Sequence, residues 1–488
     1  ILAYQPESSS PWVTGAAFES GKSYLAGITS TAHTAAGIDT AVASMITANT
    51  SAGSSVAGSN LKFTTSSDAL EGGAGDDKIT GVYQDAGGTG TTIAPGDSVD
   101  GKAGTDALTI NFAGTHGGAA KTLSAVQTDN VEKLLVSNFE TTADDTTIET
   151  GLMTGLTTVG FHSSSSTGDT ILNNMKNIVD AEMRNGAGDL TLTYNGVGKL
   201  TGSADTQNLT VSAITAGTFT ADGAETIAVK SELSKSTITA TASNTLKYFN
   251  VTGDANLTNS TALVWAATGN GATPDGYVDS TAFTGNLSVD VSGSASSVDV
   301  KTGSGDDTIN FAATLTKNDK VDAGAGDDLV KITGHDGATT LKITDRTLTN
   351  VESLRVEATT NKDTSLNATG DTISTYQLVE NDTTSKDATI TKLDLTDTVE
   401  ILNNVDNQDA GAFTFGFADP SGTDDSFTFK VKGTTAQAAE SIESVTAADV
   451  ETITIDSGTF GSTAMTSSDS NVLASGVFSG TKTLNVTG

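Results

Sequence analysis

The sequence contains no cysteine and only four histidines, which are His33, His116, His162 and His335. Without cysteine the chain can form neither disulfides nor thiolate-bound metal sites. The histidines show no H-E-x-x-H motif or other paired ligand spacing, so the sequence excludes a zinc protease centre of that kind. It also lacks a G-x-S-x-G elbow and a phosphate loop ending in Lys-Ser or Lys-Thr. Enzyme classes that depend on these motifs are therefore not expected.

Basic and aromatic residues are scarce as well. The chain has 25 Lys and Arg against 59 Asp and Glu, which gives a net charge of −34, and only 5% of its residues are aromatic. A chain this acidic is a poor partner for nucleic acid or an anionic membrane, whereas divalent cations are natural counterions. No apolar run approaches the length of a membrane span, so no membrane insertion is expected. Carboxylates could supply a glycosidase or lyase pair, but the aromatic platforms and basic clusters of such clefts are scarce.

The remaining composition predicts an all-β chain. Thr, Ser, Ala, Gly, Asp and Asn dominate, and they surround regularly alternating Val, Ile and Leu residues. At 488 residues the chain exceeds one compact core, so it forms either several domains or an elongated repeat. Residues 14–48 differ, because their apolar side chains follow the 3–4 spacing of amphipathic helices. The chain begins at Ile1 without methionine or a signal-like segment, and we expect its ends to be processed or truncated.

The most informative stretch is GGAGDDKIT, which starts at Gly72 and fits the nonapeptide G-G-x-G-x-D-x-U-x, where U is aliphatic. Its glycines permit the positive φ angles of a tight turn and bring carbonyl oxygens together. The aspartate adds a carboxylate, and hard oxygen ligands of these kinds suit Ca²⁺. Asp68 precedes Asp77 by nine residues, so the period of the repeat is present together with the motif.

Further turns of this type occur in pairs. Asp77 and Asp106 are 29 residues apart, as are Asp68 and Asp97, which is one coil of about 18 residues plus an insertion at 83–92 that we expect to project as a hairpin or loop. Asp307 and Asp328 are 21 residues apart, and Asp319 lies nine residues before Asp328. The counterpart of Asp319 in the preceding coil is Val298, so that edge lacks one ligand.

We therefore predict two well-formed calcium edges and weaker ligands beside them. The candidate calcium-binding residues are Gly73, Gly75, Asp77, Gly104, Asp106, Gly303, Gly305, Asp307, Gly324, Gly326 and Asp328, with Asp68, Asp97 and Asp319 as the weaker members. Other acidic turns, at Asp169, Asp189, Asp371 and Asp424-Asp425, are degenerate versions for which an ordinary Asx turn is the simpler interpretation. No catalytic residue is predicted.

A second repeated unit follows each pair of turns. Asn130-Val131-Glu132 matches Asn350-Val351-Glu352, and looser copies contain Glu225, Glu400 and Glu451. Alternating apolar residues after a turn are typical of stacked rungs that each bury one face against their neighbours. The alternating Phe413, Phe415, Phe417, Phe427 and Phe429 are interpreted as one packed face of a strand pair.

The predicted fold is an elongated parallel β-helix or β-roll solenoid preceded by a short helical segment. The predicted units are a helical N-terminal segment and linker at 1–60, a first calcium-clamped solenoid module at 61–290, and a second module at 291–488.

The turns resemble the RTX calcium-binding repeats of bacterial proteins exported by type I secretion. The order of elements between Asp68 and Glu132, with a helical segment just ahead of them, is similar to the start of the lattice-forming domain of Caulobacter-type RTX surface-layer proteins. The close resemblance covers 61–140 and 298–360. It implies a Ca²⁺-dependent two-dimensional lattice of identical copies on a bacterial surface, anchored to lipopolysaccharide or another surface glycan by an N-terminal domain that is mostly missing here.

Three hypotheses follow from these features. The first is an extracellular, self-assembling surface-layer protein without enzymatic activity, whose folding Ca²⁺ stabilises. The second is an RTX-type secreted adhesin or matrix protein that uses the same folding switch. The third, a polysaccharide-active enzyme on a β-helix, is disfavoured by the scarcity of aromatic and basic residues.

Overall fold

The computed structural model describes most of the chain between residues 57 and 487. The described ranges are 57–84, 90–112, 121–124, 126–139, 145–165, 168–195, 200, 202–266, 273–294, 297–335, 341–342, 347–358, 363–380, 387–403, 409–433, 441–457, 472–473 and 475–487. The helical segment predicted at 14–48 lies outside these ranges. Within them, no helix is long and apolar enough to cross a membrane.

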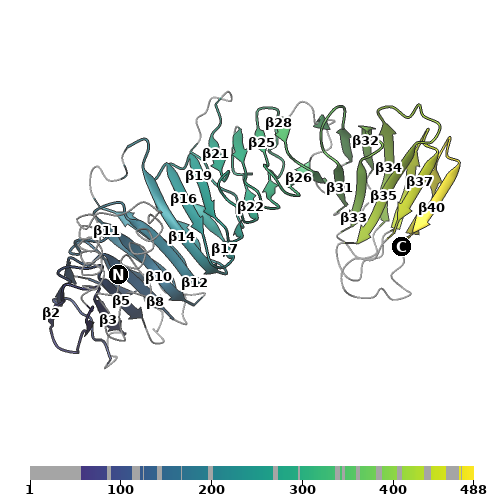
Figure 1. Cartoon of the computed structure of the whole chain (residues 1–488). Coiled ribbons are helices and arrows are strands. Elements are labelled where there is room, and N and C mark those ends of the chain that lie inside the picture. The colour runs from purple at the N-terminus through teal and green to yellow at the C-terminus, as the bar shows by residue number, and fades with distance from the viewer. Residues whose placement is uncertain are drawn as a thin grey trace, which may run out of the picture.

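The fold is an all-β parallel solenoid. Each strand pairs in parallel with a strand from the next coil of the chain, for example β3 with β5 and β5 with β8. The repeated coils stack into an elongated, curved body that runs from the N-terminal strands to β40 (Figure 1). The predicted fold class is therefore confirmed.

One sheet of thirteen strands extends over the first two thirds of the solenoid. Its strands, in spatial order, are β1 (Asn60–Lys62), β3 (Lys78–Tyr83), β5 (Ala107–Phe112), β8 (Lys133–Asn138), β10 (Thr158–Ser164), β12 (Asp180–Gly186), β14 (Thr206–Ile214), β16 (Thr226–Ser231), β19 (Tyr248–Gly253), β21 (Gly276–Asp279), β23 (Val298–Lys301), β25 (Lys320–Asp322) and β28 (Thr347–Thr349). We call it the long sheet.

A second sheet of eleven strands continues to the C-terminal end. Its strands are β17 (Ser236–Ile238), β20 (Leu257–Asn259), β22 (Leu287–Asp290), β24 (Thr308–Asn310), β26 (Leu329–His335), β29 (Ser353–Ala358), β31 (Thr375–Glu380), β33 (Thr398–Asn403), β35 (Ser426–Gly433), β37 (Thr452–Asp456) and β40 (Thr483–Thr487). We call it the C-terminal sheet.

Three smaller sheets complete the coils. One contains β2 (Ala69–Glu71), β4 (Ser98–Asp100) and β7 (Gln127–Asp129). Another contains β6 (Lys121–Leu123), β9 (Thr146–Glu149), β11 (Thr170–Met175), β13 (Leu190–Tyr194), β15 (Thr218–Thr220) and β18 (Ala240–Ala242). The last contains β27 (Leu341–Lys342), β30 (Thr364–Asn367), β32 (Ala388–Leu393), β34 (Asp409–Phe417), β36 (Ser441–Ala447) and β38 (Val472–Leu473), with β39 (Gly476–Val477) also paired to β36. Along the solenoid the long sheet thus exchanges partners before the C-terminal sheet replaces it.

Alternating side chains build the core. In β5, Leu108, Ile110 and Phe112 are buried, while the residues between them are partly exposed. The register stacks Leu108 between Ile79 of the preceding coil and Leu134 of the following one. Burying each such side chain stabilises the fold by about 1.5–3 kcal/mol, so the solenoid is held together by one continuous column of apolar rungs.

The phenylalanines of the last coils pack differently from the prediction. All five are buried, but Phe413, Phe415 and Phe417 lie on β34 and Phe427 and Phe429 on β35, and these strands belong to different sheets. Their rings meet across the core, with 4.8 Å between the ring centroids of Phe417 and Phe427. The interpretation as one face of a strand pair was wrong, because each strand pairs with the next coil and faces its sequence neighbour across the interior.

Both predicted repeat lengths are confirmed by the strand register. Lys78 pairs with Ala107, which is an offset of 29 residues, and Thr308 pairs with Leu329, which is an offset of 21. The insertion at 83–92 is closed at its base, where Thr92 N donates to Val82 O. Near residue 290 the pairing continues without a break from β22 to β24, and the division into two modules stays a prediction.

Replacing a core phenylalanine should therefore destabilise the last coils. We expect Phe427→Ala to lower the free energy of unfolding by about 3–5 kcal/mol, because it removes a ring that contacts Phe415 and Phe417. The control is Phe139→Ala, which changes a side chain that is 58% exposed and should cost no more than about 0.5 kcal/mol. Urea unfolding followed by circular dichroism measures both, and equal losses would contradict this account of the core.

Candidate calcium turns

The first pair of Gly-Asp turns leads into the long sheet. The turn with Gly73, Gly75 and Asp77 precedes β3, and the turn with Gly104 and Asp106 precedes β5 in the next coil. Both aspartates are buried, with exposed fractions of 1% and 0%. Asp77 N donates to Asp106 Oδ1 over 2.7 Å, so the carboxylate of one coil receives the backbone N–H of the coil before it.

The second pair repeats this arrangement at the C-terminal sheet. Gly303, Gly305 and Asp307 precede β24, while the equivalent turn ending at Asp328 precedes β26. Asp307 N donates to Asp328 Oδ1 over 2.8 Å, and Leu287 N donates to Asp307 Oδ1 over 2.7 Å. The structure thus brings together the residues that the sequence paired.

The weaker candidates lie at other edges. Asp68 N donates to Asp97 Oδ1 over 2.9 Å, but the Asp68 carboxylate accepts its own hydrogen bonds from Thr64. Asp319 Oδ1 accepts the N–H of Val298 over 2.8 Å, which places Val298 one coil before Asp319 as the spacing predicted. Each of these edges therefore carries one carboxylate that bridges two coils.

Glycine is required where one turn lies directly on the next. Gly326 has a φ of +144°, and a Cβ at this position would lie 2.3 Å from the Gly305 carbonyl oxygen. A Cβ at Gly324 would lie 2.0 Å from the Gly303 carbonyl oxygen. Gly73 is different, since a Cβ there would come no closer than 3.9 Å to another atom. The stacked turns thus present backbone carbonyl oxygens to each other at short range.

The first aspartate of each Asp-Asp pair also has a role, which the sequence analysis missed. Asp76 Oδ1 accepts Thr105 N over 2.8 Å, and Asp306 Oδ1 accepts Asp327 N over 3.0 Å. These bonds run in the opposite direction, because the earlier coil supplies the acceptor. The doubled aspartate in G-D-D was the signal: its first member bridges one way and its second the other.

The Asn-Val-Glu repeat ends each inner ladder. Glu132 Oε2 accepts Asp106 N over 2.7 Å, and Glu352 Oε2 accepts Asp328 N over 2.9 Å. Asn130 and Asn350 have φ angles of +50° and +53°, a left-handed conformation that asparagine tolerates better than most residues. The repeat was interpreted as a simple rung, but its recurrence after each Gly-Asp pair indicated the additional role.

Two of the three looser copies act in the same way. Glu225 accepts Asp205 N over 2.9 Å, and Glu451 accepts Asp425 N over 3.1 Å. Glu400 does not, because it lies within β33, accepts a hydrogen bond from Gln377 and pairs with Lys430. The carboxylate ladder is therefore a general feature of this solenoid and extends beyond the Gly-Asp turns.

Burial makes the inner aspartates electrostatically unusual. Burial, together with the charges of Asp307 and Glu352, raises the pKa of Asp328 to about 7. Burial likewise raises the pKa of Asp106 and of Asp307, whereas the backbone N–H of Ser59 holds the pKa of Asp77 below its usual value. Negative charge thus accumulates at the turns without a cationic side chain to balance it.

Three buried oxygen atoms in these turns have no hydrogen-bond partner: Oδ2 of Asp106, Asp307 and Asp328. Unpaired buried carboxylate oxygens are costly, and they are what a hard cation would use. Among the described residues, no three Asp, Glu, His or Cys side chains converge in a metal-binding arrangement. The turns therefore fit Ca²⁺ only if backbone carbonyl oxygens complete the ligand set.

The degenerate acidic turns use their carboxylates within the protein. Asp169 Oδ1 accepts Asp189 N over 2.8 Å, and Asp189 Oδ1 accepts Thr218 N over 2.6 Å. Asp371 Oδ2 accepts the hydroxyl of Tyr376 over 2.6 Å, and Asp425 Oδ2 accepts Gly422 N over 2.9 Å.

The histidines offer no second site in the described ranges. His162 Nε2 lies 2.8 Å from Glu182 Oε1 on the outer face of the long sheet, and the same glutamate pairs with Arg184. His33 and His116 lie outside the described ranges, and His335 ends β26.

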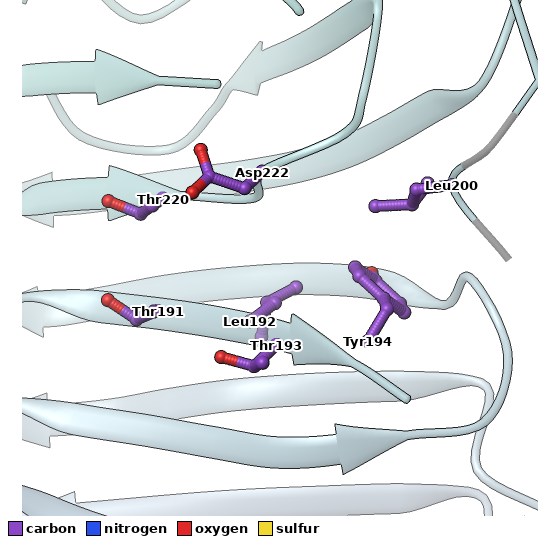
Figure 2. A pocket seen from close by; sticks show the side chains of 7 residues that line it. All are labelled: Thr191, Leu192, Thr193, Tyr194, Leu200, Thr220 and Asp222. Atoms are coloured by element: carbon purple, nitrogen blue, oxygen red, sulfur yellow. The ribbon is translucent and has the colours of Figure 1, made fainter. Parts of the chain in front are cut away.

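An open hollow of about 280 Å³ lies over the ends of β13 and β15 (Figure 2). Thr191 and Thr193 line it from β13, with Tyr194 and Leu200 facing each other at one end and Asp222 on the opposite side. The Tyr194 hydroxyl is hydrogen-bonded to the Gln207 side chain. Asp222 is the only acidic residue that lines the hollow, so these side chains do not form a carboxylate pair.

Comparison with known proteins adds no relative. No protein family model matches the sequence, and no curated protein matches it significantly.

Removing the acceptor that ends a ladder should destabilise the fold. We expect Glu352→Ala to lower the free energy of unfolding by about 1–3 kcal/mol, because Asp328 N loses its acceptor. Glu352→Gln keeps an acceptor oxygen and serves as the matched control. Urea unfolding measures both, and an alanine variant as stable as the glutamine variant would disprove the role of this bond.

The pH dependence of stability should contain a contribution from Asp397. Burial raises its pKa to about 6, from 3.8 in an unfolded chain, and the charges of Asp394 and Asp371 add to the effect. The folded state therefore binds the proton more tightly, so stability falls as the pH rises from about 4 to about 6. Two pKa units correspond to on the order of 3 kcal/mol.

Asp397→Asn should flatten this part of the profile while keeping an acceptor for Asp394 N. Asp424→Asn changes an exposed aspartate and is the control. Urea unfolding of the metal-free protein between pH 4 and pH 7 gives the profiles. If the Asp397 variant and the control follow the same curve, Asp397 is not the titrating group.

Proposed function

We propose that the protein is a structural, calcium-stabilised component of a bacterial cell surface, where copies assemble into a two-dimensional lattice. The observation that carries this proposal is the set of inner ladders, in which Asp106, Asp307 and Asp328 are buried with one unpartnered carboxylate oxygen each. Ca²⁺ would be held by these carboxylates, by Asp77 and by the carbonyl oxygens of the stacked glycines. When bound it would supply the positive charge that the turns lack.

Mass action supports a structural role for the cation. A ligand that binds only the folded state stabilises it by about 2.7 kcal/mol when its concentration is 100 times its dissociation constant. Ca²⁺ would also reduce the mutual repulsion within a chain whose net charge is −34. The same neutralisation would allow copies to approach each other, which links folding to assembly.

The shape of the molecule agrees with a scaffold. A long parallel solenoid presents extended, regular outer faces, and its stability comes from contacts between neighbouring coils. The resemblance of the Gly-Asp turns and their surrounding sequence to RTX surface-layer proteins favours a lattice over separate molecules. We propose accordingly that the protein acts outside the cell and has no catalytic role.

Calcium removal tests the proposal. In millimolar Ca²⁺ we expect a higher unfolding temperature than in EDTA, and ordered sheets in negative-stain electron microscopy. Mg²⁺ at the same concentration should not substitute, because it dehydrates reluctantly and demands strict octahedral geometry. Separate rods in Ca²⁺ would favour the adhesin alternative, and identical thermal unfolding and assembly with and without Ca²⁺ would disprove the proposal.

A paired variant locates the effect in the turns. Asp328→Asn keeps an acceptor for Asp307 N and removes the buried charge, so in EDTA it should be at least as stable as the wild type. In Ca²⁺ it should lose most of the stabilisation that one site provides, about 2–3 kcal/mol. Asp222→Asn, an exposed change outside the ladders, is the control and should respond to Ca²⁺ as the wild type does.

A further inference from the structure

The turn between β16 and β17 carries the most exposed large apolar side chain in the described part of the chain. Leu233 is 82% exposed, although an isolated leucine on a surface would not by itself require explanation. Its backbone, however, has a φ of +64°, in the left-handed region that bulky residues rarely adopt. The leucine is thus both exposed and conformationally strained.

The surroundings hold this strained turn in place. Ser234 N donates to Glu232 O over 2.7 Å, which closes a three-residue turn with Leu233 at its centre. The Glu232 carboxylate is fixed from two sides, by Arg184 Nη2 at 2.9 Å and Lys230 Nζ at 2.6 Å. A strained residue that its neighbours keep in one position is a reason to look for a function.

An open hollow of about 640 Å³ begins beside this leucine. It crosses the corresponding turns of three successive coils, and its lining residues are Lys230, Glu232, Leu233, Gly253, Asp254, Ala255, Ala282 and Thr284. The far part of the hollow has small residues, so it has room for a side chain from outside. Within the described part of the chain, the exposed Asp254 forms no ion pair.

We propose that this face is a two-fold contact between copies of the chain, in which Leu233 of each copy inserts into the hollow of the other. A two-fold interface must be self-complementary, so a projection and a matching hollow have to lie side by side on one surface, as they do here. The charges are complementary in the same sense, since Lys230 of one copy can reach Asp254 of the other. This inference rests on the self-assembly proposed above and names one of its contacts.

The contact is expected to be weak in isolation. One leucine in one hollow buries far less surface than a stable dimer needs. In a two-dimensional array, however, many such contacts act together, and each one is strengthened by the others. The contact would therefore order the lattice more than it would hold a dimer in solution.

Leu233→Gly tests the contact without harming the fold. Glycine accepts the positive φ angle, so the variant should be at least as stable as the wild type while the projecting side chain is lost. Sedimentation velocity at rising concentration should show the association constant of the dimer falling at least about tenfold. Val264→Ala, which shortens a side chain that is 67% exposed and does not line the hollow, should leave association unchanged.

Charge reversal provides a second, independent measurement. Lys230→Glu and Asp254→Lys should each weaken association, and the double variant should restore it because the opposite charges meet again across the two-fold axis. If the double variant is as weak as the single variants, the two side chains do not face each other and the proposed geometry is wrong.

Cross-linking identifies the occupant of the hollow. Since the chain has no cysteine, Leu233→Cys protein mixed with Ala282→Cys protein should form disulfide-linked pairs under mild oxidation. A mixture of Leu233→Cys with Val264→Cys protein should form far fewer. Equal yields in the two mixtures would mean that another molecule, or none, occupies the hollow.

These outcomes separate the contact from the function it serves. Ordered calcium-dependent sheets that form equally well with Leu233→Gly would overturn the contact and leave the surface-layer proposal standing. Wild-type protein that forms the Leu233–Ala282 cross-link but no sheets would support the contact and count against the lattice.

Discussion

The constraint on which this structure depends is the need to satisfy the backbone where one coil turns into the next. Within the sheets every strand finds its partner one coil away, but at the turns the ladder of strand hydrogen bonds is interrupted. Buried N–H groups left there without acceptors would be costly. The chain supplies carboxylates as acceptors, as in the bonds from Asp77 N to Asp106 and from Asp328 N to Glu352.

This solution concentrates negative charge along the edges of the solenoid. Each inner aspartate is useful as an acceptor and costly as a buried anion, and the raised pKa of Asp328 reflects that conflict. A protonated aspartate, an asparagine or a bound cation would each relieve it. Asn256 and Asn286 take the place of aspartates in the outer ladder just before Asp306, where Asn256 accepts Asn286 N and Asn286 accepts Asp306 N. The Gly-Asp turns, in contrast, keep the charge and surround it with carbonyl oxygens, which is the composition expected of a calcium-dependent clamp.

Much of this could be predicted from the sequence because the relevant signals are local and repeated. The nonapeptides specify a turn followed by a strand, and the intervals of 29 and 21 residues specify which turns stack, as the registers of Lys78 with Ala107 and Thr308 with Leu329 confirm. The roles of Asp76 and Glu132 were not predicted, although their sequence signals were present. A carboxylate's target depends on which N–H the neighbouring coil presents, and the local sequence does not specify this. The facing of Phe417 and Phe427 was missed because periodicity identifies a buried face without identifying the opposing one.

The sequence alone therefore determined the all-β repeat, the pairing of the Gly-Asp turns and the acidic character of their edges. These features follow from properties of single residues and short intervals: glycine permits the tight turn, aspartate ends it, and alternating apolar side chains bury one face of each strand. The tertiary structure decided what the intervals could not specify, including the exchange of partner sheets along the axis, the opposite directions of the two carboxylate ladders, and the hollow beside Leu233. Each of these arises only when coils distant in sequence are stacked, because the groups that meet there belong to different coils.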